Sequence, residues 1–141
     1  MNRTVDVLRY VIGVLGRNLD GTATVADHLP PGVELAGALP LVRVDLLPGA
    51  STPQVWGGSG IPPSLDGVTL DIDVLASSRA EAVPIAERVR EVLYALPTLD
   101  GSEVTSVDCP PLSTRPDYNP HVRRLGGDVT LIARNTPGAV I

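Results

Sequence analysis

Two aspartates, Asp71 and Asp73, are the first side chains in this sequence that suggest chemistry. They alternate with apolar residues in the pattern of a β-strand, which places both carboxylates on one face, roughly 7 Å apart. Paired carboxylates can perform acid–base catalysis or bind a metal ion. Because no third ligand accompanies the pair, we interpret it as part of a solvated strand face, with Arg43 pairing across strands.

Cys109 and His121 are the candidates for a thiol–imidazole dyad. Such a dyad requires the two side chains within hydrogen-bond reach and a third group that orients the base. Cys109 stands at an expected strand end, before two prolines, where a small apolar residue would serve equally well. We therefore expect a packed cysteine and an exposed histidine. The remaining histidine, His28, is distant in sequence, so the chain does not supply the ligands of a zinc site.

The glycine-rich segment Gly57–Gly60 has the composition of a phosphate-binding loop, but no helix pattern follows it. Phosphate-binding loops need a helix N-terminus and usually a lysine. All 11 basic residues are arginines, which excludes any function that depends on a lysine. Trp56 lies in the same Gly-, Pro- and Ser-rich loop, 50–66. A lone tryptophan there either packs onto the body of the protein or anchors an interface. We predict no catalytic, metal-binding or cofactor-binding residue.

Length and charge narrow the class of protein further. The chain has 141 residues, which predicts a single domain, residues 1–134, followed by a tail, 135–141, with no role in the core. A net charge of −5 argues against a nucleic-acid-binding surface, which usually needs a basic patch. A single cysteine excludes an internal disulfide and suits a reducing cytoplasm. The N-terminal pattern indicates an amphipathic helix rather than a signal peptide, and no apolar run reaches the ~18 residues of a membrane span.

Hydrophobic periodicity predicts two helices and five strands. The helices are 5–18 and 78–96, and the second begins with a capping-box motif from Ser78 to Glu81. The last strand contains Gly126–Gly127, which suggests a bulge or bend. The order α-β-β-β-α-β-β predicts an α+β fold, with both helices on one face of a mixed, mainly antiparallel sheet of four to five strands. The predicted strands are 22–26, 41–47, 68–74, 103–109 and 121–134.

Three segments, in their order and spacing, resemble the tail terminator proteins of long-tailed bacteriophages, especially those that infect actinobacteria. The first segment is the strand-to-helix run DIDVLASSRAEAVPIAERVREVLYALP, residues 71–97. The second is LPLVRVDLL, residues 39–47. The third is a link of the form P-x-x-x-x-P-D-Y-N, residues 111–119, which leads into a final strand ending DVTLIAR. The similarity covers most of residues 22–134.

This resemblance implies an architecture and no enzyme activity, because the family has no catalytic motif. Such proteins form a ring, usually of six copies, on top of the finished tail tube. The ring stops polymerisation of the tube protein and presents a docking surface to the head–tail connector or head-closure protein. The resemblance also implies a virion protein of the tail neck, made in the host cytoplasm, with no membrane partner. Genomic DNA would pass through the ring without sequence-specific binding, and an acidic lumen would repel its phosphates.

A closed ring needs heterologous contacts between unlike surfaces of identical subunits. Side chains of both charges and two aromatic residues are available for such contacts, together with the Pro- and Gly-rich loops 48–66 and 110–120, which can adapt on binding. Three alternatives remain open: another neck or tail-completion protein, a small cytoplasmic enzyme using Cys109 or the aspartate pair, and a ligand-binding module built on the Trp56 loop. The predicted interface residues are Arg43, Trp56, Asp71, Asp73, Tyr118, Arg123 and Arg124.

Overall fold

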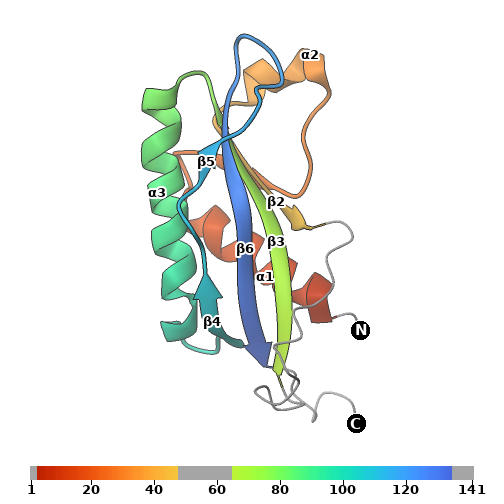
Figure 1. The fold of residues 1–141 in the computed structure, drawn as a ribbon, viewed down its shortest axis with the longest axis vertical. Helices are drawn as coiled ribbons and strands as arrows, with labels where there is room; N and C mark the ends of the chain where they lie inside the picture. The colour runs from red at the N-terminus through yellow and green to blue at the C-terminus, as the bar shows by residue number, and fades with distance from the viewer. Residues whose placement is uncertain (1–2, 48–64, 135–141) are drawn as a thin grey trace.

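The computed structural model describes residues 3–47 and 65–134 of the chain. Within this part the chain forms two long helices and one mixed sheet of six strands (Figure 1). The predicted α+β class is therefore confirmed. Trp56 and the tail 135–141 lie outside the described residues, so the predictions made for them stay predictions.

The sheet has the strand order β1-β2-β3-β6-β4, and the short β5 also pairs with β6. β1 runs parallel to β2, and the other pairs are antiparallel. β3 and β6 are the two longest strands and pair along their whole length, so they form the centre of the sheet. The strands are β1 (Thr24–Ala26), β2 (Leu41–Leu46), β3 (Leu65–Ala76), β4 (Val104–Asp108), β5 (Ser113–Thr114) and β6 (Arg123–Arg134).

Both long helices cover the same face of the sheet. In Figure 1, α1 (Arg3–Asn18) lies behind β3 and β6, and α3 (Arg79–Ala95) runs beside it. Three short helical turns connect the larger elements: α2 (Gly32–Leu35), η1 (Ala36–Ala38) and η2 (Leu96–Thr98). No helix among the described residues is long and apolar enough to cross a membrane.

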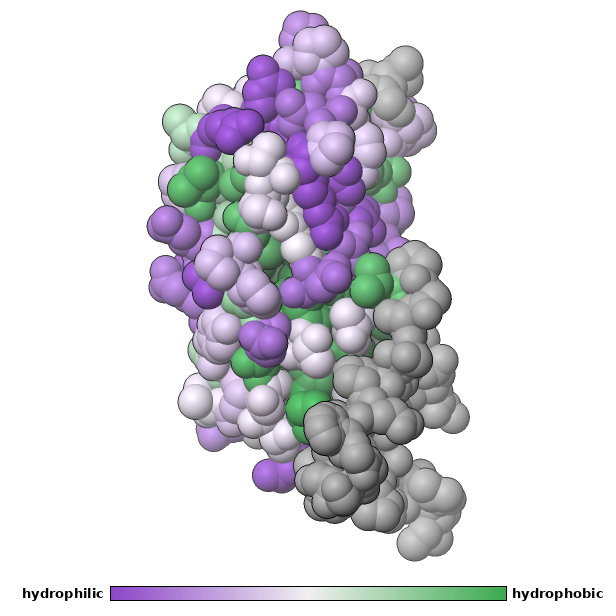
Figure 2. Space-filling model, viewed as in Figure 1, coloured by the Kyte–Doolittle hydropathy of each residue, from purple (hydrophilic) through white to green (hydrophobic). Residues whose placement is uncertain are grey.

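The two faces of the sheet are built differently. Alternate residues of β3, from Val68 to Ala76, point into an aliphatic core between the sheet and the helices, as its period of two predicts. On the opposite face, Leu75 belongs to a second, smaller cluster with Leu35, Leu41 and Val122. Figure 2 shows hydrophilic side chains gathered in the upper part of that face. At the end of the molecule that carries α2, the smaller cluster therefore covers the second face of the sheet.

Of the bulge or bend predicted at Gly126–Gly127, the bulge is wrong. The β3–β6 register runs without a shift from the Leu65–Arg134 pair to the Ala76–Arg123 pair. The irregularity lies instead in β4, between Val104 and Ser106. A glycine in a strand marks either a bulge or a close approach by another group, and the second explanation applies at Gly126, as described below.

The start of α3 follows the predicted capping box in one of its two halves. The Ser78 hydroxyl accepts a hydrogen bond from the Glu81 backbone N–H at 3.2 Å. The Glu81 carboxylate accepts from the backbone N–H of Ser77, also at 3.2 Å, rather than from that of Ser78. The cap therefore closes one residue further out than the standard motif.

Replacing Ser78 by alanine is expected to lower the free energy of unfolding by about 1 kcal/mol, because a helix N–H loses its acceptor. Ser77→Ala is the matched control, since it keeps the backbone N–H bond to Glu81 and loses only an exposed hydroxyl bond of 3.3 Å to the same carboxylate. Urea unfolding of both variants followed by circular dichroism measures the difference. Equal losses in the two variants would contradict the assignment of Ser78 as the cap.

Candidate functional site

The polar side chains of β3 lie on the sheet face opposite the helices, at its centre. Asp73 pairs in register with Arg43 on β2 and with Gly126 on β6. Its side chain is 0% exposed, whereas we expected a solvated strand face. That expectation is wrong, because side chains from β2, from β6 and from the segment after β5 close over the carboxylate. The cross-strand pairing with Arg43 is confirmed.

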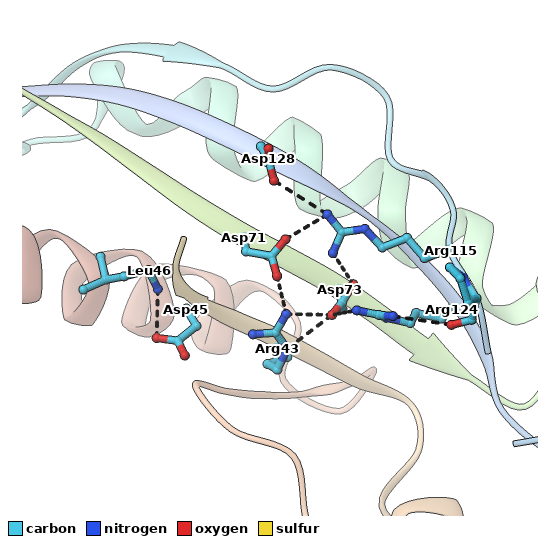
Figure 3. A network of polar contacts seen from close by, with 9 residues as sticks. Arg43, Asp45, Leu46, Asp71, Asp73, Arg115, Arg124 and Asp128 are labelled. Carbon is cyan, nitrogen blue, oxygen red and sulfur yellow. Dashed lines mark hydrogen bonds and ion pairs between the residues drawn. The ribbon is translucent and has the colours of Figure 1, made fainter. Parts of the chain in front are cut away.

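Three guanidinium groups surround the Asp73 carboxylate (Figure 3). Arg43 donates to Oδ2 from Nη2 at 2.7 Å and from Nε at 3.2 Å. Arg124 donates from Nη2 to the same oxygen at 2.9 Å, and Arg115 donates from Nη1 to Oδ1 at 2.8 Å. Both carboxylate oxygens are therefore engaged by charged donors, which form the stronger class of hydrogen bond.

Asp71 extends this cluster by two residues along β3. It pairs with Arg43, and its Oδ1 lies 2.8 Å from Arg115 Nη2. Arg115 also lies 3.6 Å from Asp128 on β6. We call Arg43, Asp71, Asp73, Arg115, Arg124 and Asp128 the ion-pair network. Its three cations face three carboxylates, so its formal charges cancel.

Burial and neighbouring charges shift the pKa of Asp71 in opposite directions. Desolvation alone would raise its pKa, but hydrogen bonds and charges from Arg115 and Arg43 outweigh it and hold the pKa below the ordinary value of 3.8. Asp71 is therefore ionised in the folded protein over the physiological range. An ionised carboxylate clasped by two guanidiniums is suited to joining segments of the chain and poorly suited to exchanging protons with a substrate.

Arg124 connects the network to the turn before β6. Its guanidinium lies 4.5 Å from the centre of the Tyr118 ring, within cation–π range. Its backbone N–H donates to Asp117 Oδ1 at 3.1 Å, and its Nη1 lies 3.4 Å from the Pro116 carbonyl oxygen. Its Nε is buried and has no hydrogen-bond partner among the residues that the structure describes. Asp117 also pairs with Arg123 at 3.1 Å.

Gly126 makes room for the buried carboxylate. A Cβ at this position would lie 2.4 Å from Asp73 Oδ1, 2.7 Å from the Ile72 carbonyl oxygen and 2.8 Å from Arg115 Cδ. Two of these three contacts involve side chains of the network itself. The missing side chain at Gly126 is therefore a structural requirement of the network.

Cys109 and His121 do not form a dyad. Cys109 is fully buried and His121 is exposed, as predicted, and no hydrogen bond joins them in the described part of the chain. Burial raises the pKa of the Cys109 thiol despite the nearby charge of Arg90, so the reactive thiolate is disfavoured. The backbone of Cys109 is held by α3, since the Tyr94 hydroxyl accepts from its N–H at 2.9 Å and Arg90 Nε donates to its carbonyl at 3.0 Å. No cluster of His, Cys, Asp or Glu among residues 3–47 and 65–134 could hold a metal ion.

A shallow hollow of about 560 Å³ lies on the other side of the sheet, where α1 ends beside the edge strand β1. Small residues and backbone dominate its wall, and Asp20 is a charged side chain on it. It contains no residue that the sequence suggested for chemistry. Its lining consists of Gly16, residues 20–25 and residues 37–40.

The structure brings together five of the seven predicted interface residues. Arg43, Asp71, Asp73 and Arg124 belong to the ion-pair network, and Tyr118 stacks on Arg124. Arg123 lies beside them and pairs with Asp117. Arg115 and Asp128 were missed. Arg115 lies in a Pro-rich link that has no periodic pattern, and Asp128 is a polar position of the alternating last strand, which is assigned to solvent by default. The contact of these residues with another subunit stays a prediction.

No protein-family model matches the chain, and no curated protein matches it significantly.

Replacing Gly126 by alanine is expected to cost about 1–3 kcal/mol of unfolding free energy, the usual range for overpacking. The added methyl group must displace either Asp73 or backbone. Gly16→Ala is the matched control, because a Cβ there meets nothing within 4 Å and alanine favours the helix. Chemical denaturation measures both. A neutral Gly126→Ala variant would contradict the close packing of the carboxylate.

The ion pairs of Asp71 predict a pH dependence of stability. Because its pKa is lower in the folded than in the unfolded chain, the carboxylate stabilises the fold above its unfolded pKa. This contribution is lost as the pH falls through the folded pKa. The difference in unfolding free energy between the wild type and Asp71→Asn is therefore expected to be largest near neutrality and to shrink from about pH 5 downward. Urea titrations across this range measure it, and a constant difference would contradict the assignment.

Proposed function

We propose that this chain is a structural subunit of a long-tailed bacteriophage virion, the tail terminator. In this role a ring of copies, six by the resemblance, caps the tail tube, stops its polymerisation and provides the docking surface for the head connector. One observation carries the proposal: the three segments that resemble tail terminators form one contiguous unit. They lie on β2, on β3 with α3, and on the link into β6, and β2, β3 and β6 are neighbouring strands.

The ion-pair network supports a role in assembly. It ties β2, β3, β6 and the segment after β5 to one another through charge-assisted hydrogen bonds. A subunit that acts through the shape of its outer surfaces needs such a rigid body, because preformed contacts lower the cost of ordering on association. The aspartates use their oxygens within the chain, in keeping with a protein that binds rather than reacts.

Burial assigns different roles to the predicted contact residues. Asp73 is fully buried, and Arg43, Asp71 and Arg124 have side chains 15%, 15% and 16% exposed. We assign these four to holding the subunit in shape. Tyr118 is 46% exposed and the Arg123 side chain 38% exposed. These two are the contact candidates, because exposed tyrosine and arginine side chains are enriched among interface hot spots.

Genetic removal of the subunit tests the proposal. Phage that lack it are expected to make heads normally but to assemble tail tubes of uncontrolled length that do not join heads, as seen by negative-stain microscopy of lysates. A cryo-EM map of the wild-type neck is expected to show a ring of this chain between tube and connector. Its placement elsewhere in the neck would favour the alternative of another completion protein. Its absence from purified virions would refute the proposal.

The contact assignment has its own test in the same assay. Arg123→Ala is expected to fold normally, because the bonds it removes within the chain, to Asp117 and to the Pro120 carbonyl, are exposed. It is expected to rescue the mutant phage poorly, because the contact with the neighbouring subunit is lost. Arg17→Ala is the matched control, since Arg17 is an exposed arginine on α1, far from the network. Thermal unfolding of both purified variants verifies the fold. Full rescue by Arg123→Ala would remove this residue from the interface and leave the tail-terminator proposal standing.

A further inference from the structure

Residues 113–121, which we call the strap, cross the edge of β6 on their way to that strand. β5, the start of the strap, pairs Ser113 with Gly126 and Thr114 with Leu125. The backbone N–H of Arg115 donates to the Arg124 carbonyl at 3.0 Å. β4 pairs with β6 only from Thr130 to Ala133. The strap therefore occupies the part of the β6 edge that β4 leaves uncovered, at residues 124–126.

Apolar contacts hold the chain at the two residues that flank the strap, and not within the strap itself. Leu112 packs against the main core on one side, and Val122 is fully buried in the smaller cluster on the other. Between them, none of residues 113–121 is buried. A segment that buries so little apolar surface belongs to the parts of a protein that open at low free-energy cost.

Charged groups hold the middle of the strap in place. The Arg115 guanidinium reaches Asp73, Asp71 and Asp128, two of them at 2.8 Å. Asp117 binds the backbone of Arg124 and the side chain of Arg123. Hydrogen bonds between charged groups are stronger than those between neutral groups, and the Arg115 bonds are less exposed than the Asp117–Arg123 pair. The Arg115 contacts therefore dominate the side-chain contacts of this segment.

We propose that the strap opens and closes over β6 as a unit, with Arg115 as its latch, while the sheet and helices stay folded. Opening frees the main-chain groups of β6 at residues 124–126 and uncovers the Asp73 carboxylate. The device goes beyond the proposed function, because it follows from the contacts of the strap alone and holds whatever the protein binds.

Hydrogen exchange of the full chain, read by mass spectrometry on peptides that cover the strap, tests this inference. Arg115→Met removes the charge and keeps the length of the side chain, and it is expected to speed exchange of the strap about tenfold or more. Arg115→Lys keeps a charge and is expected to retain part of the protection. The peptides of β3 and α3 are expected to exchange as in the wild type in both variants.

Arg43→Met is the matched control, because Arg43 binds the same two aspartates from β2, within the body of the sheet. It is expected to leave exchange of the strap within about twofold of the wild type. Chymotrypsin gives a second readout, since Tyr118 lies in the strap and its bond is cut only when the segment opens. Wild-type protection of the strap in Arg115→Met would overturn the latch. Equal acceleration across strap, β3 and α3 would mean that Arg115→Met destabilises the whole fold, and Asp117→Asn, in the exposed part of the strap, then decides. Acceleration of the strap alone in Asp117→Asn would support the independent opening, and any other result would overturn it.

Discussion

A single buried carboxylate, that of Asp73, determines how the outer face of this protein is arranged. Taking a charge out of water is costly unless other charges and hydrogen bonds compensate it. Here three arginines supply that compensation, and they come from β2, from the strap and from β6. Removing the anion would leave three guanidiniums close together without their common partner. The position of each of these segments therefore depends on one carboxylate group, that of Asp73, near the centre of the sheet.

The chemistry of arginine suits this arrangement. A planar guanidinium can donate to two carboxylates at once, as Arg43 and Arg115 both do between Asp71 and Asp73. Lysine offers one point charge on a flexible stem, and this chain contains none. The two faces of the sheet thus rely on different forces. The helix side is held by aliphatic packing, and the opposite side by directional ion pairs between arginine and aspartate side chains.

Elements with strong periodicity could be predicted from the sequence, and features that depend on distant partners could not. The alternation in β3 and the helical spacing of α3 identified both elements, and the fold class followed from their order. β5 and α2 span two and four residues, too few to show a period. The burial of Asp73 was missed because a polar residue in an alternating strand is assigned to solvent by default. Arg115, 42 residues further along the chain, carries no local sign of its partner.

The fit between Asp73 and Gly126 also constrains how sequences of this kind can diverge. While the carboxylate is in place, any side chain at position 126 collides with it. Exchanging the aspartate for a smaller residue does not free position 126, because a Cβ there would still lie 2.7 Å from the Ile72 carbonyl oxygen and 2.8 Å from Arg115 Cδ. A side chain at this position therefore needs compensating changes in the strand backbone and in Arg115 as well. Sequence drift is expected to spare Gly126 and to reach Gly127 first, where a Cβ would meet its nearest atom, Leu112 Cδ2, at 3.4 Å.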